Sequence, residues 1–191
     1  MADLYIHLAV AKRYVEKHGG TINTKDFYDG NVIPDLDDDK EITHYGKRGE
    51  TDLLKRNLEK VNLKKFLEFN TLDSDLNRGK FLHLITDWEY YNNFVPKDRI
   101  RAMSFAEYGK SLTYARALLE RQLVEKYDLS MAMVSFKDEL KNWDEKWKRE
   151  DSKRYGNEKI DAEPLYNAQD LDEFIERVSS VNLEKMVIAN S

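Results

Sequence analysis

The 191-residue sequence contains no cysteine, which excludes disulfide bonds and thiolate metal sites. No apolar run approaches the length of a membrane span, so we expect no transmembrane helix. The first residues, Met1 to Leu4, carry neither a basic segment nor a long apolar segment, and they do not read as a secretory signal. The sequence therefore predicts a cytoplasmic protein, unless a leader has been removed.

An excess of basic residues is also lacking. The chain has 31 Lys and Arg against 36 Asp and Glu, which gives a net charge of −5 with both signs interspersed. A nucleic-acid-binding protein should carry a basic face, so no nucleic-acid partner is indicated. Charged residues make up 35% of the chain, a share that suits long, solvated helices, and the 41% of hydrophobic residues suffices for a folded core.

The periodicity of apolar residues predicts an all-α protein of six or seven helices. It gives helices over residues 3–17, 51–69, 74–94, 105–127, 136–147 and 171–178, the last with a possible break near Asn182. Ser104 and Glu107 form a capping box at the start of the fourth. Residues 19–50 show no sustained period and are expected to form a long loop with at most a helical turn, and the polar residues 150–168 are expected to form a second loop. We expect one domain over residues 1–191, with a metal-binding half (1–100) and a helical C-terminal half (101–191).

Only four histidines occur, and His83 belongs to the most informative pair. His83 and Asp87 are four residues apart, which places both side chains on one face of the helix, one turn apart. An imidazole and a carboxylate so placed can hold one divalent ion between them. The alternative is a plain hydrogen-bonded pair, which is the commoner use of this spacing.

Two further histidines can join this pair. His7 lies on the inward stripe of the first helix, where a histidine is more often a satisfied core residue. Because His83 also faces inward, one polar centre shared by both is more economical than two separate buried imidazoles. His44 follows Asp35 by nine residues, in a region rich in acids.

That acidic region also resembles a calcium-binding loop, because Asp35, Asp37 and Asp39 alternate. An EF-hand needs glycine at the sixth position and a bidentate acid at the twelfth. Lys40 and Gly46 occupy those positions here, so the EF-hand is disfavoured. The plainer interpretation of the acids after Asp35 is a solvated loop.

The ordered motifs resemble the zinc-dependent phospholipase C family, and most closely its small, uncharacterised bacterial branch. The similarity covers residues 5–94. The matching pieces, in chain order, are His7, Gly30 to Asp35 (GNVIPD), Thr43 to Tyr45 (THY) and Gly79 to Asp87 (GKFLHLITD). This resemblance implies a phospholipase C-like, all-α metallohydrolase fold.

The resemblance also implies ligand roles. Asp35, His44, His83 and Asp87 would bind one zinc ion, and His7 would help bind a second zinc ion bridged by Asp87. The family completes the second site with its mature N-terminal residue, for which this chain offers no evident equivalent. The family's third zinc needs histidines after the His-xxx-Asp helix, and none follows His83 here. That departure weakens the expectation of full phospholipase activity.

We therefore expect a metal-dependent hydrolase that attacks a small phosphoester substrate with metal-activated water. Asp35 is the candidate general base. Tyr45, Lys47 and Arg48 are candidate phosphate-binding residues, although these three could equally be ordinary surface-loop residues.

Zinc is the first choice of ion, and a carboxylate-rich shell also accepts manganese or iron. The alternative is a non-catalytic metal-binding helical protein with a structural or interaction role; an HD-type hydrolase would need an adjacent His-Asp pair, which is absent.

Overall fold

In the computed structural model, the described part of the chain is helical, and it contains no strand. It comprises residues 2–37, 39–47, 61–155 and 163–190. The helices are α1 (Leu4–His18), α2 (Thr24–Leu36), α3 (Lys40–His44), α5 (Leu63–Phe69), α6 (Asp75–Glu89), α7 (Lys97–Ala102), α8 (Phe105–Lys126), α9 (Lys137–Tyr155), α10 (Ala168–Val178) and α11 (Leu183–Asn190). A π-helical turn follows α6, and a short 3-10 turn precedes α9. The all-α class is confirmed.

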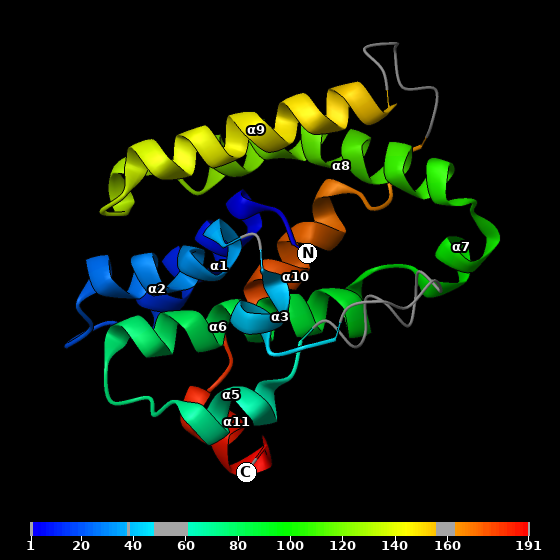
Figure 1. Ribbon diagram of the computed structural model, residues 1–191. Helices are drawn as coiled ribbons and strands as arrows, with labels where there is room; N and C mark the ends of the chain where they lie inside the picture. The colour runs from blue at the N-terminus through cyan, green and yellow to red at the C-terminus, as the bar shows by residue number, and fades with distance from the viewer. Residues whose placement is uncertain (1, 38, 48–60, 156–162, 191) are drawn as a thin grey trace.

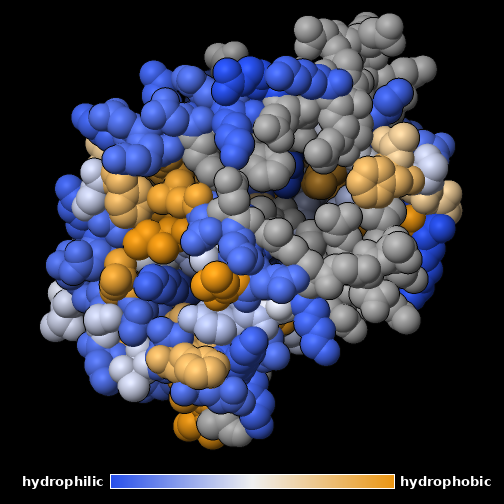
Figure 2. All heavy atoms as spheres, in the orientation of Figure 1, coloured by the Kyte–Doolittle hydropathy of each residue, from blue (hydrophilic) through white to orange (hydrophobic). Residues whose placement is uncertain are grey.

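The helices form layers around α1, α2 and α6. The long helices α8 and α9 lie side by side along one side of the molecule, and α5 and α11 lie together at the opposite end, with the C-terminus (Figure 1). Hydrophilic side chains cover much of the face shown in Figure 2, as the high charge content predicts. Among the helices described, none has both the length and the apolar character needed to cross a membrane.

Two glycines allow α2 and α6 to pack with their backbones in close contact. A Cβ atom at Gly30 would overlap the carbonyl oxygen of Leu76, and one at Gly79 would overlap that of Phe27. Both obstacles are backbone atoms, which no rotamer change can move away. Glycine at these two positions therefore sets the distance between α2 and α6, the two helices that carry Asp35 and the His83–Asp87 pair.

Several predicted helices are confirmed. The first is α1, which begins after the cap residue Asp3. The third is α6 with its π-helical turn, which begins after Ser74 and ends at Phe94, before Pro96. The fourth is α8, and the last is α10, separated from α11 near Asn182. Of the predicted helix 51–69, residues 51–60 lie outside the described residues, and the rest contains α5.

The prediction of a long loop with at most a helical turn over residues 19–50 is wrong, because the described part of this region contains the 13-residue α2 as well as the short α3. Asn23 caps α2, with its side chain accepting from the backbone N–H of Asp26. The helix escapes detection because Asp29, Asn31 and Asp35 are buried along with its apolar residues, so no amphipathic period arises.

Two C-terminal expectations also need correction. Helix α9 extends past the predicted end at residue 147 to Tyr155, so residues 150–155 of the predicted loop are helical. Residues 156–162 lie outside the described part. The short α7 was not predicted at all; it follows Pro96, which suits the start of a helix because its missing N–H is not needed there.

The capping box of α8 gives a stability prediction. The Ser104 hydroxyl accepts from the backbone N–H of Glu107 at 3.3 Å, and the Glu107 carboxylate accepts from the N–H of Ser104 at 2.7 Å. Ser104→Ala should lower the free energy of unfolding by about 1 kcal/mol, measured by urea denaturation. Glu107→Gln retains a side-chain oxygen that can accept from the cap, so it should have a smaller effect. Equal losses from both changes would contradict this account.

Candidate metal centre

Five side chains from four helices converge in the interior. His7 comes from α1, Asp35 from α2, His44 from α3, and His83 and Asp87 from one face of α6, and each is at most 1% exposed. These are the five residues that the sequence predicted as metal ligands. The structure brings all of them together.

The distances between the donor atoms suit a shared ion. His44 Nε2 lies 3.2 Å from Asp87 Oδ2, and His7 Nε2 lies 3.4 Å from Asp87 Oδ1. Asp35 is slightly farther away, with Oδ1 3.7 Å from His44 Nε2 and Oδ2 3.9 Å from His7 Nε2. Ligands bound to zinc at 2.0–2.1 Å in tetrahedral geometry are about 3.4 Å apart. Two groups, His7–His83–Asp87 and Asp35–His44–His83, meet the spacing for an ion, with His83 common to both.

Hydrogen bonds outside the centre set the histidine tautomers. His83 Nδ1 lies 2.7 Å from the carbonyl oxygen of Asn31 and must donate to it. The Thr43 hydroxyl donates to the carbonyl of Asp39 at 3.4 Å, and it can then accept from His44 Nδ1 at 2.9 Å. Both histidines therefore carry a lone pair on Nε2, the nitrogen that faces the centre.

These two lone pairs face each other. His83 Nε2 and His44 Nε2 are 3.1 Å apart, and His83 also stacks on the ring of His7, with centroids 3.8 Å apart. Burial and the neighbouring His7 hold the pKa of His83 well below its ordinary value, which keeps this imidazole neutral. A cation shared by the two nitrogens would relieve their mutual repulsion.

Unpartnered polar atoms are concentrated at the same place. Within the described residues, the buried side-chain atoms without a hydrogen-bond partner include both ring nitrogens of His7, Oδ2 of Asp35 and Oδ2 of Asp87. Each such atom costs roughly 1–3 kcal/mol if nothing satisfies it. A bound cation would satisfy Nε2 of His7 and both carboxylate oxygens, so the donor set fits a metal ion.

Both carboxylates are ionised in this environment. Burial raises the pKa of Asp87, but the close approach of the His44 and His7 rings to its carboxylate outweighs burial and holds the pKa well below its ordinary value. Burial likewise raises the pKa of Asp35, but its electrostatic interactions with the His83 ring and the Lys40 ammonium reverse that effect, so that this pKa is lowered. Ionised carboxylates and a neutral His83 are the protonation states that a divalent ion requires.

Two contacts at the centre were missed by sequence reasoning. The backbone N–H of the buried Ala2 donates to Asp87 Oδ1 at 2.7 Å, although no residue before His7 was expected at the centre. The Lys40 ammonium lies 3.2 Å from Asp35 Oδ1, whereas the sequence showed Lys40 only as a misfit in a calcium loop. Neither contact has a sequence signal, because both depend on how the chain folds back on itself.

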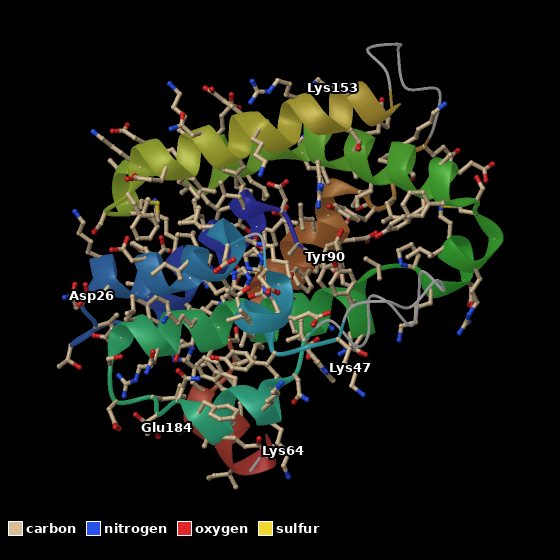
Figure 3. All side chains as sticks on the ribbon, viewed as in Figure 1. Asp26, Lys47, Lys64, Tyr90, Lys153 and Glu184 are labelled. Atoms are coloured by element: carbon tan, nitrogen blue, oxygen red, sulfur yellow. The ribbon has the colours of Figure 1, made fainter. Side chains whose placement is uncertain are left out.

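The predicted phosphate-binding residues lie in the segment after α3. Tyr45 has a left-handed backbone (φ 60°), its hydroxyl accepts from Asn70 Nδ2 at 2.9 Å, and its ring packs edge-on against Phe66. Lys47 is exposed and extends outward from the molecule (Figure 3). Arg48 lies outside the described residues. The substrate-binding role of these three residues stays a prediction.

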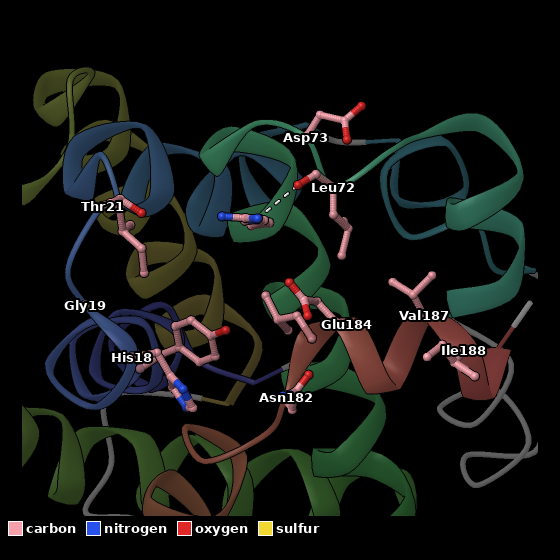
Figure 4. Close-up of a pocket in the computed structure, with 13 residues that line it drawn as sticks. His18, Gly19, Thr21, Leu72, Asp73, Asn182, Glu184, Val187 and Ile188 are labelled. Atoms are coloured by element: carbon pink, nitrogen blue, oxygen red, sulfur yellow. Dashed lines mark hydrogen bonds between the residues drawn. The ribbon is translucent and has the colours of Figure 1, made fainter.

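A separate cleft of about 590 Å³ lies between the end of α1, the start of α6 and α11 (Figure 4). Its lining includes Tyr14, His18, Leu72, Glu184 and Ile188. None of the five residues of the centre lines this cleft. It therefore does not open onto the candidate metal centre.

Comparison with known proteins yields no relative: no family model, no curated protein and no solved structure matches the chain. The resemblance to the zinc-dependent phospholipase C family accordingly stays a prediction from the motifs.

Proposed function

We propose that this protein binds a divalent metal ion at the buried His–Asp centre and uses it to hydrolyse a phosphoester. The observation that carries the proposal is the donor set, which offers three imidazole nitrogens and two carboxylates. Structural zinc sites are usually closed by four ligands rich in thiolate, whereas histidine and carboxylate ligands predominate in catalytic sites. Five candidate ligands without a thiolate therefore favour a catalytic centre.

The chain's own residues can support hydrolysis. A bound divalent ion would supply the Lewis acidity that lowers the pKa of a water molecule toward neutrality. Asp35 Oδ2 has no hydrogen-bond partner among the described residues, so it can accept a proton from that water as a general base. The second-sphere partners Asn31 and Thr43 keep His83 and His44 oriented with Nε2 inward.

The charges of the centre suit an anionic ligand. Asp35 and Asp87 contribute two negative charges and Lys40 one positive charge, so a divalent ion leaves a net charge of +1. Hydroxide or a phosphate oxygen would balance this charge. We therefore propose a small phosphate-containing substrate. Zinc fits the nitrogen and oxygen donors, and manganese or iron would fit the same set.

A second candidate function is a metal ion that only stabilises the fold. The burial of all five ligands favours it, because each is at most 1% exposed. In that case the helices would hold the ion without a path for substrate. The two functions differ in whether bound metal confers turnover.

Metal analysis and turnover together test the proposal. Purified protein should contain at least one divalent ion per chain by mass spectrometry and should hydrolyse a chromogenic phosphodiester. His83→Ala should lose both properties, whereas Asp35→Asn should retain an ion and lose about 10²–10⁴-fold in turnover, as expected for removal of a general base. His18→Ala is the matched control, because His18 is an exposed histidine outside the centre. Stoichiometric metal without turnover on a panel of phosphomonoesters and phosphodiesters would refute the hydrolase and support the structural role.

A further inference from the structure

Lys40 joins the end of α2 to the metal centre. Its ammonium donates to the backbone carbonyl of Asp35 at 2.7 Å, to the carbonyl of Pro34 at 3.2 Å and to Asp35 Oδ1 at 3.2 Å. These three acceptors equal the number of N–H donors on a lysine ammonium. The side chain is only 16% exposed, so water competes little with these contacts. The Lys40 ammonium thereby binds the backbone carbonyl and the carboxylate of Asp35 at the same time.

The two carboxylate oxygens of Asp35 are consequently unlike. Oδ1 accepts a charge-assisted hydrogen bond from Lys40, whereas Oδ2 is buried without a hydrogen-bond partner among the described residues. We propose that Lys40 is a positioning residue that keeps Oδ1 of Asp35 off the ion, so that only Oδ2, the oxygen assigned above as the general base, faces the ion and its water. This inference rests on the proposed function, because it concerns how the same centre would hold its ion.

The number of oxygens that Asp35 offers decides whether a position remains for water. A carboxylate that binds through both oxygens occupies two positions of the coordination sphere. Catalytic sites need an open position, where water or substrate binds. Asp35 Oδ1 already lies 3.7 Å from His44 Nε2, a spacing that suits a shared ion, so its hydrogen bond to the Lys40 ammonium is what would keep it from binding that ion. Loss of the ammonium would then fill the water position without expelling the ion.

A purely structural role for Lys40 makes a different prediction. Pro34 and Asp35 lie in the last turn of α2, where helix carbonyls have no partner within the helix. A lysine that only caps this end would affect the stability of the metal-free protein and leave the coordination of the ion unchanged. The two roles therefore separate in the spectrum of a bound metal rather than in a melting temperature.

Cobalt(II) in place of the native ion provides this test, since its visible absorption reports the number of ligands. We would load wild type, Lys40→Met, Lys40→Gln and Lys40→Arg with Co²⁺, with Lys25→Met as the control at the exposed N-terminal end of the same helix. Lys40→Met should bind the same amount of Co²⁺ with a weaker, shifted absorption, because Asp35 adds a second oxygen. Its turnover of a chromogenic phosphodiester should fall about 10–100-fold, the usual effect of losing a second-sphere partner of a metal ligand.

The companion variants keep the test decisive. Lys40→Gln can still donate to the helix carbonyls but lacks the charge, so it should show the same spectral change even if Lys40→Met folds poorly. Lys40→Arg retains a cation and should restore the wild-type spectrum. An unchanged Co²⁺ spectrum in both neutral variants would overturn the inference. If their melting temperature also falls, Lys40 only stabilises the end of α2. If wild type binds Co²⁺ but shows no turnover, the proposed hydrolase fails, while the spectra still decide the role of Lys40.

Discussion

Adding Zn²⁺ to the metal-free protein should raise its melting temperature by roughly 8–16 °C when free zinc is about 1,000 times the dissociation constant. The reason is that we expect the ion to bind only where the five candidate ligands are assembled, so that its binding free energy would add to the stability of the folded state. Without the ion, His83 Nε2 and His44 Nε2 oppose each other at 3.1 Å, and Oδ2 of Asp87 is buried without a partner. Differential scanning calorimetry with and without a chelator measures the shift.

Two variants test whether the rise in melting temperature comes from zinc binding at the candidate metal centre. His83→Ala should abolish it, because His83 belongs to both candidate ligand groups. His18→Ala should retain it in full, since His18 lies at the exposed end of α1. The shift should also diminish as the pH falls, because protons compete with the ion for the ligands. A zinc shift that survives in His83→Ala would place the binding site elsewhere in the chain.

Gly79→Ala should destabilise the protein by about 3 kcal/mol or more, the upper range for inserting a methyl group into a well-packed interior. Alanine is the better helix former by about 1 kcal/mol, so propensity alone predicts stabilisation, with the opposite sign. The new Cβ would collide with the backbone carbonyl of Phe27 in α2, and only a separation of α2 from α6 would relieve the collision. That movement would carry Asp35 away from His83 and Asp87.

The matched measurements are urea denaturation and zinc affinity. Gly30→Ala should behave like Gly79→Ala, because its Cβ would meet the backbone of Leu76 from the other side of the same contact. Lys25→Ala, on the exposed surface of α2, is the control and should change stability by less than about 0.5 kcal/mol. A stabilised Gly79→Ala with unchanged zinc affinity would show that the two helices are not held together in this way.

The clearest failure of prediction from the sequence concerns α2. Three of its polar residues are buried and interact with distant parts of the chain. The Asp29 carboxylate accepts from the backbone N–H of Ser135 at 2.6 Å, the backbone carbonyl of Asn31 accepts from His83, and Asp35 belongs to the candidate metal centre. A helix that is buried on several faces, with polar residues among the buried ones, shows no hydrophobic period. The pattern therefore resembled a loop.

What the sequence determined by itself is local. A spacing of four places His83 and Asp87 on one helix face, and Ser104 with Glu107 starts α8, because helix geometry relates residues three and four apart without outside help. The five candidate ligands were also named from the sequence, through an ordered set of motifs.

Only the tertiary structure decided how those residues meet. It brought α2 against α6 through Gly30 and Gly79, placed the nitrogen of Ala2 on Asp87, and set Lys40 on one oxygen of Asp35. These contacts join residues from different segments of the chain, or depend on the turn between two helices, so no periodicity records them. Their geometry follows from the packing of backbones and from the need of buried charges for partners, and both arise only when the chain is folded.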